Sequence, residues 1–254
     1  MKSSFTLLFL VFISGLVHAQ CNVDVLGSTQ VKCGDSVQLS VNLKLSKVYD
    51  GDLSLNDVYF ADAFTGYVVG SGGKILKTTD GGISWTSHDF MTLRWSRVCF
   101  IDSQHGFIGH IASSTGRVAY TSDGGDTWTL TNFSSPDPLT DLAMLNPTSC
   151  IVVGEYGMIK KTINGGQTWV NIASGINENL NVVEFPTETT GYICTQQGNI
   201  LKSTDGGNTW TKLVTGHYMP ELRCSSFLNE NIGYVGGGLW RIYKTIDGGL
   251  KWIS

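Results

Sequence analysis

One eight-residue pattern, Thr/Ser-x-Asp/Asn-Gly-Gly-x-x-Trp, occurs five times in this chain of 254 residues. The copies read TTDGGISW from Thr78, TSDGGDTW from Thr121, TINGGQTW from Thr162, STDGGNTW from Ser203 and TIDGGLKW from Thr245, and successive copies are 41 to 43 residues apart. A constant period of this size indicates a repeat architecture in which each period is one supersecondary unit.

The repeated pattern favours a structural turn over a reactive group. Asp-Gly-Gly between β-rich runs is typical of tight turns, because glycine supplies positive φ values and Asp or Asn bonds nearby backbone N–H groups. Catalytic carboxylates do not occur as five equivalent copies, and the third copy carries an amide. We therefore expect Ala at Asp80 or Asp205 to lower stability without abolishing binding. The interpreted structural residues are Asp80, Trp85, Asp123, Trp128, Asn164, Trp169, Asp205, Trp210, Asp247 and Trp252.

Each repeat divides into four short strands. In the first repeat, alternating apolar residues and punctuating glycines predict strands over 55–61, 67–70 and 74–79, and a fourth strand beginning at Trp85. Four antiparallel strands in about 42 residues have the size of a β-propeller blade. The prediction is an all-β fold of five such blades.

The residues from Val58 to Trp85 support a family resemblance. They read V-x-F-x-D-x-x-x-G-Y-x-x-G-x-x-G-x-I-x-K-T-x-D-G-G-x-S-W, which resembles the repeat of photosystem II stability/assembly-factor-like propellers. The end of the pattern is similar to the Asp-box (BNR repeat) of sialidases, xyloglucan-cleaving glycosidases and sortilin-type receptors. The resemblance covers about residues 51–252. It implies a peripheral Asp-box, and it implies either an enzyme or a binding protein.

The N-terminus predicts export. Residues 1–19 combine a lysine, an apolar run and the small-residue pattern Val17-x-Ala19 of a cleaved signal peptide. The apolar run is too short to span a bilayer, so we expect a bacterial protein that is secreted, periplasmic or at the cell surface. We expect residues 20–50 to form an N-terminal β segment in which Cys21 and Cys33 can form a disulfide; this segment resembles the start of Ig-like modules in exported proteins of non-photosynthetic bacteria. Residues 51–254 hold the propeller repeats.

Charge and cysteine spacing exclude several kinds of partner. The formal net charge is −4 and the five arginines form no basic run, which argues against nucleic-acid binding. The remaining cysteines lack the spacing of zinc ligands, and we expect buried free thiols without metal or cofactor. These cysteines are Cys99, Cys150, Cys194 and Cys224.

The fifth repeat predicts an incomplete ring. Only Ile253 and Ser254 follow its tryptophan, so an outer strand is nearly missing and an open edge is expected. Asp-box relatives usually have six to eight blades, and we expect further blades encoded beyond Ser254 and a broad melting transition for this chain. The alternating segment 36–45 is the alternative, as a strand that closes five blades.

Candidate contact residues gather on the face opposite the Asp-boxes. There the turns between the second and third strands and the connections between blades present arginine, aromatic and carboxylate side chains on a rigid scaffold. Exposed Trp and Arg dominate binding hot spots, although packing between blades is an equal alternative for both tryptophans. The candidates are Arg94, Trp95, Arg97, His110, Glu155, Tyr156, His217, Tyr218, Glu221, Arg223, Trp240 and Arg241.

The residues favour a binding protein over an enzyme. A sialidase-like site needs an arginine triad, and its usual F/Y-R-I-P phrase is absent; in the nearest match, LWRIYK, Tyr243 replaces the proline. A glycosidase needs two facing carboxylates, and nothing in the spacing pairs Glu155 with Glu221. We expect a non-enzymatic, exported module that binds a protein or a glycan. The alternative is a secreted glycoside hydrolase of the sialidase or xyloglucanase type.

Overall fold

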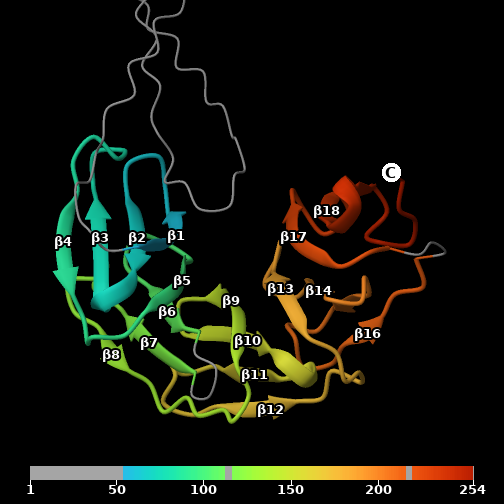
Figure 1. The fold of residues 1–254 in the computed structure, drawn as a ribbon, viewed down its shortest axis with the longest axis horizontal. Coiled ribbons are helices and arrows are strands. Elements are labelled where there is room, and N and C mark those ends of the chain that lie inside the picture. Colours follow the sequence, from blue (N-terminus) through green and yellow to red (C-terminus); the bar gives the residue numbers. More distant parts are fainter. Residues whose placement is uncertain (1–53, 112–115, 216–218, 254) are drawn as a thin grey trace, which may run out of the picture.

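The computed structural model describes residues 54–111, 116–215 and 219–253. These residues form nineteen β-strands in five antiparallel sheets, with three short 3-10 turns and no α-helix. The sheets follow one another in chain order around an open arc, with the first and last sheets at its two ends (Figure 1). The predicted all-β fold of repeated antiparallel blades is confirmed, and each sheet is called a blade below.

Blades 1 and 2 contain four strands each, hydrogen-bonded in chain order. The first blade agrees with the predicted strands to within one residue at their boundaries. Blade 1 comprises β1 (Leu55–Phe60), β2 (Gly66–Gly70), β3 (Lys74–Thr78) and β4 (Thr86–Asp89). Blade 2 comprises β5 (Trp95–Phe100), β6 (Gly106–His110), β7 (Arg117–Thr121) and β8 (Thr129–Leu130).

Blades 3 and 4 repeat this order, and blade 5 has three strands among the described residues. Ile253 pairs with Lys244 where the fourth strand of the other blades begins. Blade 3 comprises β9 (Leu139–Asn146), β10 (Ser149–Gly154), β11 (Ile159–Thr162) and β12 (Val170–Ile172). Blade 4 comprises β13 (Leu180–Glu184), β14 (Gly191–Thr195), β15 (Ile200–Ser203) and β16 (Thr211–Lys212). Blade 5 comprises β17 (Leu222–Phe227), β18 (Gly233–Gly237) and β19 (Ile242–Thr245).

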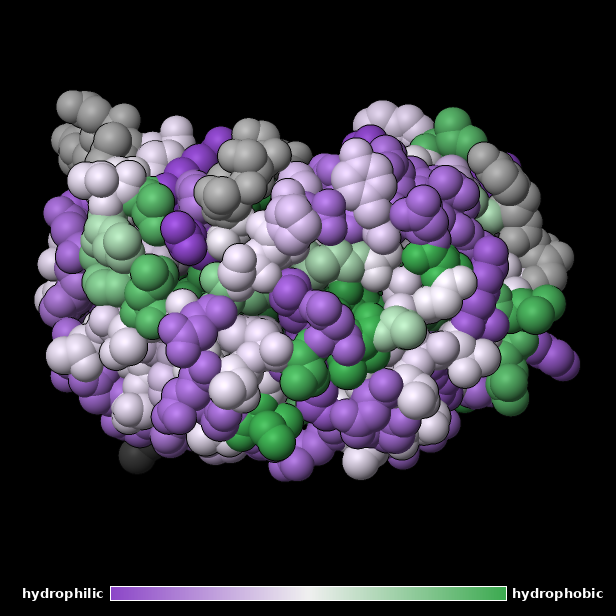
Figure 2. Space-filling view, turned by 90° about the horizontal axis from the view of Figure 1, so that it is seen from below, coloured by the Kyte–Doolittle hydropathy of each residue, from purple (hydrophilic) through white to green (hydrophobic). Residues whose placement is uncertain are grey.

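Three N-terminal predictions concern residues that the structure does not describe. The signal segment 1–19, the Cys21–Cys33 pair and the alternating segment 36–45 all lie outside the described residues. Within the described ranges, no helix is long and apolar enough to cross a membrane. Seen from below, the apolar residues of the arc form small groups separated by polar ones (Figure 2).

The Asp-box turns are closed by their own side chains. The carboxylate of Asp205 accepts hydrogen bonds from the backbone N–H of Thr209 at 3.0 Å and from its hydroxyl at 2.6 Å, and Ser203 Oγ donates to it at 2.8 Å. Asn164 makes the same turn, with Oδ1 accepting from the Thr168 N–H at 3.0 Å and Nδ2 donating to its hydroxyl at 2.9 Å. Both glycines of every copy have φ between 66° and 88°, a region that favours glycine.

We expect Asp205→Ala to lower the free energy of unfolding by about 1–2 kcal/mol, because backbone donors of the turn lose their acceptor. Asp205→Asn is the matched control and should cost much less, since Asn164 already closes the same turn in blade 3. Urea denaturation of the two variants measures the difference. Equal losses for Ala and Asn would show that the charge, and not the hydrogen-bonding pattern, stabilises the turn.

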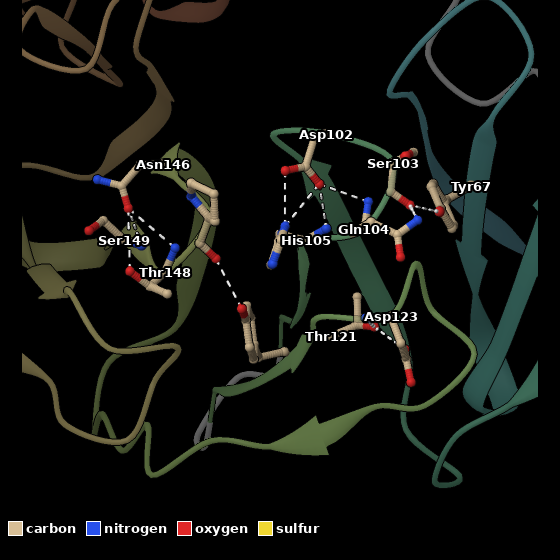
Figure 3. A network of polar contacts seen from close by, with 12 residues as sticks. Tyr67, Asp102, Ser103, Gln104, His105, Thr121, Asp123, Asn146, Thr148 and Ser149 are labelled. Atoms are coloured by element: carbon tan, nitrogen blue, oxygen red, sulfur yellow. Dashed lines mark hydrogen bonds and ion pairs between the residues drawn. The ribbon is translucent and has the colours of Figure 1, made fainter.

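Consecutive blades bury four apolar clusters between them. The face of each blade that packs against the next blade is called its forward face. On the forward face of blade 1, the ring of Tyr67 stacks on Phe100 of blade 2, with ring centres 3.7 Å apart. Its hydroxyl donates to the carbonyl of Gly124 at 3.0 Å. It also donates to the carbonyl of Ser103 at 3.3 Å (Figure 3). The first blade thus holds the Asp-box turn of the second.

Blade 4 holds blade 5 in the same way. Tyr192 stacks on Phe227 with ring centres 3.9 Å apart, and its hydroxyl donates to the carbonyls of Glu230 at 2.8 Å and Gly248 at 3.0 Å. Lys202 adds a bond from Nζ to the Gly248 carbonyl at 2.7 Å. Each of these contacts runs from one blade to the first strand or the turns of the blade that follows it in the chain.

Carboxylates add a second set of forward contacts on the inner strands. Asp57, Asp141 and Glu184 lie on the first strands of blades 1, 3 and 4, which line the inside of the arc (Figure 1). Each accepts a backbone N–H from the first strand of the next blade. The bonds are Val98 N to Asp57 at 2.9 Å, Val183 N to Asp141 at 2.9 Å and Phe227 N to Glu184 at 2.8 Å.

The four described cysteines are free, and three of them are buried as predicted. Burial raises the pKa of the Cys150 and Cys194 thiols well above the ordinary value, so both remain protonated and inert. The prediction is wrong for Cys224, which is exposed. Cys224 lies on the forward face of blade 5, and no sixth sheet covers that face among the described residues.

Candidate functional site

The face opposite the Asp-boxes, called the loop face, carries three left-handed turns between second and third strands. They are η1 (Ser71–Gly73), η2 (Glu155–Gly157) and η3 (Gly238–Trp240). Their middle residues have φ of 70° at Gly72, 54° at Tyr156 and 57° at Leu239. Left-handed backbone costs an L-residue about 1–2 kcal/mol, so the exposed side chains of Tyr156 and Leu239 are held at an energetic cost.

The third position of η1 and η2 is glycine for a steric reason. A Cβ at Gly73 would lie 1.6 Å from the carbonyl oxygen of Met91, and one at Gly157 would lie 2.1 Å from that of Ile176. In both blades the chain leading to the next blade runs directly over the turn. In η3 the same position is Trp240, with φ of 58° and a fully exposed side chain. This tryptophan thus projects from the loop face uncovered.

Blade 5 gathers several predicted contact residues around this tryptophan. The Gly238 N–H donates to the carbonyl of Glu221 at 2.8 Å, which fixes the turn against the start of β17. Arg223 forms an ion pair with the Glu221 carboxylate at 2.8 Å and keeps most of its side chain exposed. We call this group the blade-5 loop cluster. Its members are Glu221, Arg223, Leu239, Trp240 and Arg241, of which all but Glu221 are exposed.

The second predicted pair, Arg94 and Trp95, separates in the structure. Arg94 is exposed and donates from Nη2 to the side-chain oxygen of Asn56 at 3.1 Å, while its carbonyl contacts His110 Nδ1 at 2.7 Å. Trp95 is fully buried, and its indole N–H donates to the Phe90 carbonyl at 2.8 Å. Trp95 therefore belongs to the core between blades 1 and 2, so of the two roles expected for it the structure shows the packing one.

Arg97 lies inside β5 on the inner wall of the arc and not in a loop. Its Nε contacts Asp141 Oδ1 of blade 3 at 3.2 Å, which ties blades 2 and 3 together. Burial raises the pKa of Asp141 to about 6, although the Arg97 charge acts in the opposite direction. Burial also raises the pKa of Asp57. Sequence reasoning missed both Asp57 and Asp141. In the first strands of blades 1 and 3 they occupy the position that Arg97 has in blade 2.

The other candidates lie apart from these groups. Tyr156 is exposed on η2, where its backbone N–H donates to Asn179 Oδ1 at 3.3 Å, and Glu155 precedes it in the same turn. His217 and Tyr218 lie outside the described residues. Glu155 lies in η2 of blade 3 and Glu221 directly precedes β17 of blade 5, so the two carboxylates belong to blades that are not neighbours. No group of three His, Cys, Asp or Glu side chains among the described residues could hold a metal ion.

Comparison with known proteins places this arrangement in a family. The family model described as photosynthesis system II assembly factor YCF48 matches residues 40–174 and 135–252. No curated protein matches the chain. Among solved structures, YCF48 from Cyanidioschyzon merolae is 16% identical over 80% of this chain and 84% of its own, with a TM-score of 0.51. A structure of YCF48 bound to D1 peptide is 19% identical over 79% of this chain and 80% of its own, with a TM-score of 0.45.

Glycoside hydrolases share the fold. The GH74 enzyme of Niastella koreensis is 18% identical over 78% of this chain, with a TM-score of 0.65, and this chain spans 38% of that enzyme's length. At these identities the likeness to solved structures shows the propeller fold alone. The family match covers most of the chain, from the segment before the first blade to the last Asp-box tryptophan, and the chain therefore belongs to the YCF48 photosystem II assembly-factor family.

Proposed function

We propose that this protein is an exported, non-enzymatic propeller that binds a segment of another protein through its blade-5 loop cluster. The observation that carries the proposal is Trp240, which is fully exposed at a position that is glycine in blades 1 and 3. Holding a large apolar side chain on strained backbone in full contact with water is costly, and strained residues of this kind cluster at binding and active sites. Exposed tryptophan next to arginine is the composition of a binding hot spot.

Family membership supports a polypeptide ligand. YCF48, the protein after which the family model is described, has been determined in complex with a D1 peptide. Arg241 follows Trp240 directly in the chain and is exposed, so the cluster favours a ligand with an apolar anchor and an acidic neighbour. We propose protein binding without naming a photosystem partner, and we propose export from the signal pattern of residues 1–19.

The test is selection of a random phage-displayed peptide library on the mature chain, followed by affinity measurement with the selected peptides. Trp240→Ala should weaken their binding about tenfold or more, and Arg241→Glu should weaken acidic peptides selectively. Phe64→Ala is the matched control, since Phe64 is an exposed aromatic residue in the turn between β1 and β2 on the Asp-box side. Equal binding by wild type and Trp240→Ala would refute the assignment, and selective capture on a glycan array would change the ligand class.

The glycoside hydrolase alternative rests on the shared fold with GH74 enzymes. It predicts turnover of sialosides or β-glucans by the mature chain, and loss of turnover in Glu155→Gln or Glu221→Gln. We expect no turnover, because the Glu221 carboxylate is already paired with Arg223 and contacts no second carboxylate among the described residues. Cleavage that depends on either glutamate would replace the binding proposal with the enzymatic one.

A further inference from the structure

The forward face of blade 5 is exposed, whereas the corresponding side chains of earlier blades are buried. Tyr234 occupies the position of Tyr67 and Tyr192 and is 45% exposed, against 0% and 1% for those two residues. Ile242 occupies the position of Ile200 and is 66% exposed, against 0%. Blade 5 therefore presents to water a surface that blades 1 and 4 use for packing.

The polar part of this surface is also preformed. Lys244 Nζ lies 5.6 Å from the centre of the Tyr234 ring, and in blade 4 Lys202 Nζ lies 5.3 Å from the centre of the Tyr192 ring. In blade 4 this Tyr–Lys pair stacks on a phenylalanine and donates to carbonyls of an Asp-box turn. The Tyr234–Lys244 pair thus has the composition and geometry of a clamp for one more Asp-box blade.

Blade 1 carries a matching surface. Phe60 ends β1 as Phe100 ends β5, and Phe100 is the residue on which Tyr67 stacks. Phe60 is 40% exposed, whereas Phe100 is 2% exposed beneath that tyrosine. Ile83 is 74% exposed and occupies the same position in the first Asp-box as Asp126 in the second. The carboxylate of Asp126 accepts a hydrogen bond from Lys77 Nζ of blade 1 at 2.9 Å.

The match is limited to the Asp-box end of blade 1. Midway along the same face, Val68 and Leu76 are only 2% exposed and are not available to a partner. A partner can therefore contact only the rim formed by Phe60 and Ile83. In the arc, blade 1 and blade 5 stand at opposite ends and do not meet (Figure 1). The chain therefore carries both halves of one interface on two blades that do not meet in the arc.

We propose that the Tyr234–Lys244 clamp of one molecule binds the rim around Phe60 and Ile83 of a second copy of this chain. The contact is heterologous, joining the tail of one copy to the head of the next. Because it buries only the Asp-box end of blade 1, it is smaller than an interface inside the arc and forms at high protein concentration.

The experiment is sedimentation velocity over a concentration series with the mature, full-length chain. Wild type should show a mass that rises with concentration. The double variant Tyr234→Ala/K244E removes the clamp, and the single variant Ile83→Lys places a cation against Lys244 of the next copy. Each of these two variants, measured by itself, should stay monomeric. Neither change touches the buried interfaces, and circular dichroism confirms folding. Ile83→Asp supplies Lys244 with the carboxylate that Asp126 supplies to Lys77, and should tighten association about tenfold.

Mixing the two disrupted variants gives the decisive result. The Ile83→Lys copy keeps its clamp and the Tyr234→Ala/K244E copy keeps its rim, so one contact is restored and the mixture should form a dimer that grows no further. A wild type that stays monomeric throughout the series would overturn the proposal. Association that persists in either single-sided variant, or no dimer in the mixture, would equally overturn it, because the contact would then involve other surfaces.

Discussion

Gly157→Ala is expected to lower the free energy of unfolding by about 3 kcal/mol. Gly157 has a φ of 75°, which costs alanine about 1 kcal/mol. Its new Cβ would lie 2.1 Å from the carbonyl oxygen of Ile176 and 2.7 Å from Ser174 Oγ. Moving the connection between blades 3 and 4 to relieve this overlap costs roughly 1–3 kcal/mol more, and it strains the bond from Gly157 N to the Glu178 carbonyl at 2.7 Å.

Gly175→Ala is the matched control for this steric effect. Gly175 has the same φ of 75°, but nothing lies within 4 Å of its added Cβ. Alanine there should cost only the left-handed backbone, about 1 kcal/mol. Urea unfolding of both variants isolates the overlap at position 157. If the two alanines cost the same, the connection is free to move and does not require glycine beneath it.

Asp141→Ala is expected to lower the free energy of unfolding by about 2–3 kcal/mol at neutral pH. The change leaves the Val183 N–H without its acceptor at 2.9 Å and removes the partner of Arg97 at 3.2 Å. Asp141→Asn keeps an oxygen for the Val183 N–H and should cost less than half as much. Chemical denaturation at constant ionic strength measures both. A loss for Asn equal to that for Ala would assign the whole effect to the Arg97 ion pair.

The same carboxyl predicts how stability depends on pH. Its pKa is about 6 in the folded protein and 3.8 ordinarily, so between these values the folded state holds a proton that the unfolded state has released. Stability therefore falls as pH rises from about 4 to about 6. Hydrogen bonds in their turns lower the pKa of Asp80 and of Asp205 to about 2, so these carboxylates have the opposite effect. Their contribution to the stability of the protein is lost as pH falls from about 4 towards 2. Asp141→Asn should flatten the first dependence and leave the second unchanged.

The repeated turn made the strands and their order predictable. Glycines with positive φ, the Asp or Asn that closes the turn and the period of 41 to 43 residues all act locally, so they are visible in a single chain. The same local signals placed the candidate loops on one face. They do not report which side of a strand meets a neighbouring blade, and for that reason the sequence left Trp95 open between ligand contact and packing.

Contacts between blades were less accessible to sequence reasoning. Arg97 and Asp141 lie 44 residues apart and meet only because adjacent blades bring their first strands together. Aligning the five repeats position by position would have placed Asp57, Arg97 and Asp141 in register, and would have shown that Trp240 stands where Gly73 and Gly157 occur. Cys224 and Tyr234 are exposed because no further sheet among the described residues covers the forward face of blade 5. The type of either residue does not indicate whether such a sheet is present.

The forward direction of the contacts between blades has a consequence for biosynthesis. A ribosome releases blade 1 first, and Tyr67 and Asp57 then face water until the strands of blade 2 emerge to receive them. Each newly made blade thus completes the packing of the one made before it. Folding therefore proceeds from the N-terminus, with the forward face of the last completed blade exposed at the growing end. A pause in translation after blade 1 or blade 4 would leave the surface that carries Tyr67 or Tyr192 open to water, and we expect chaperones to bind it before the next blade covers it.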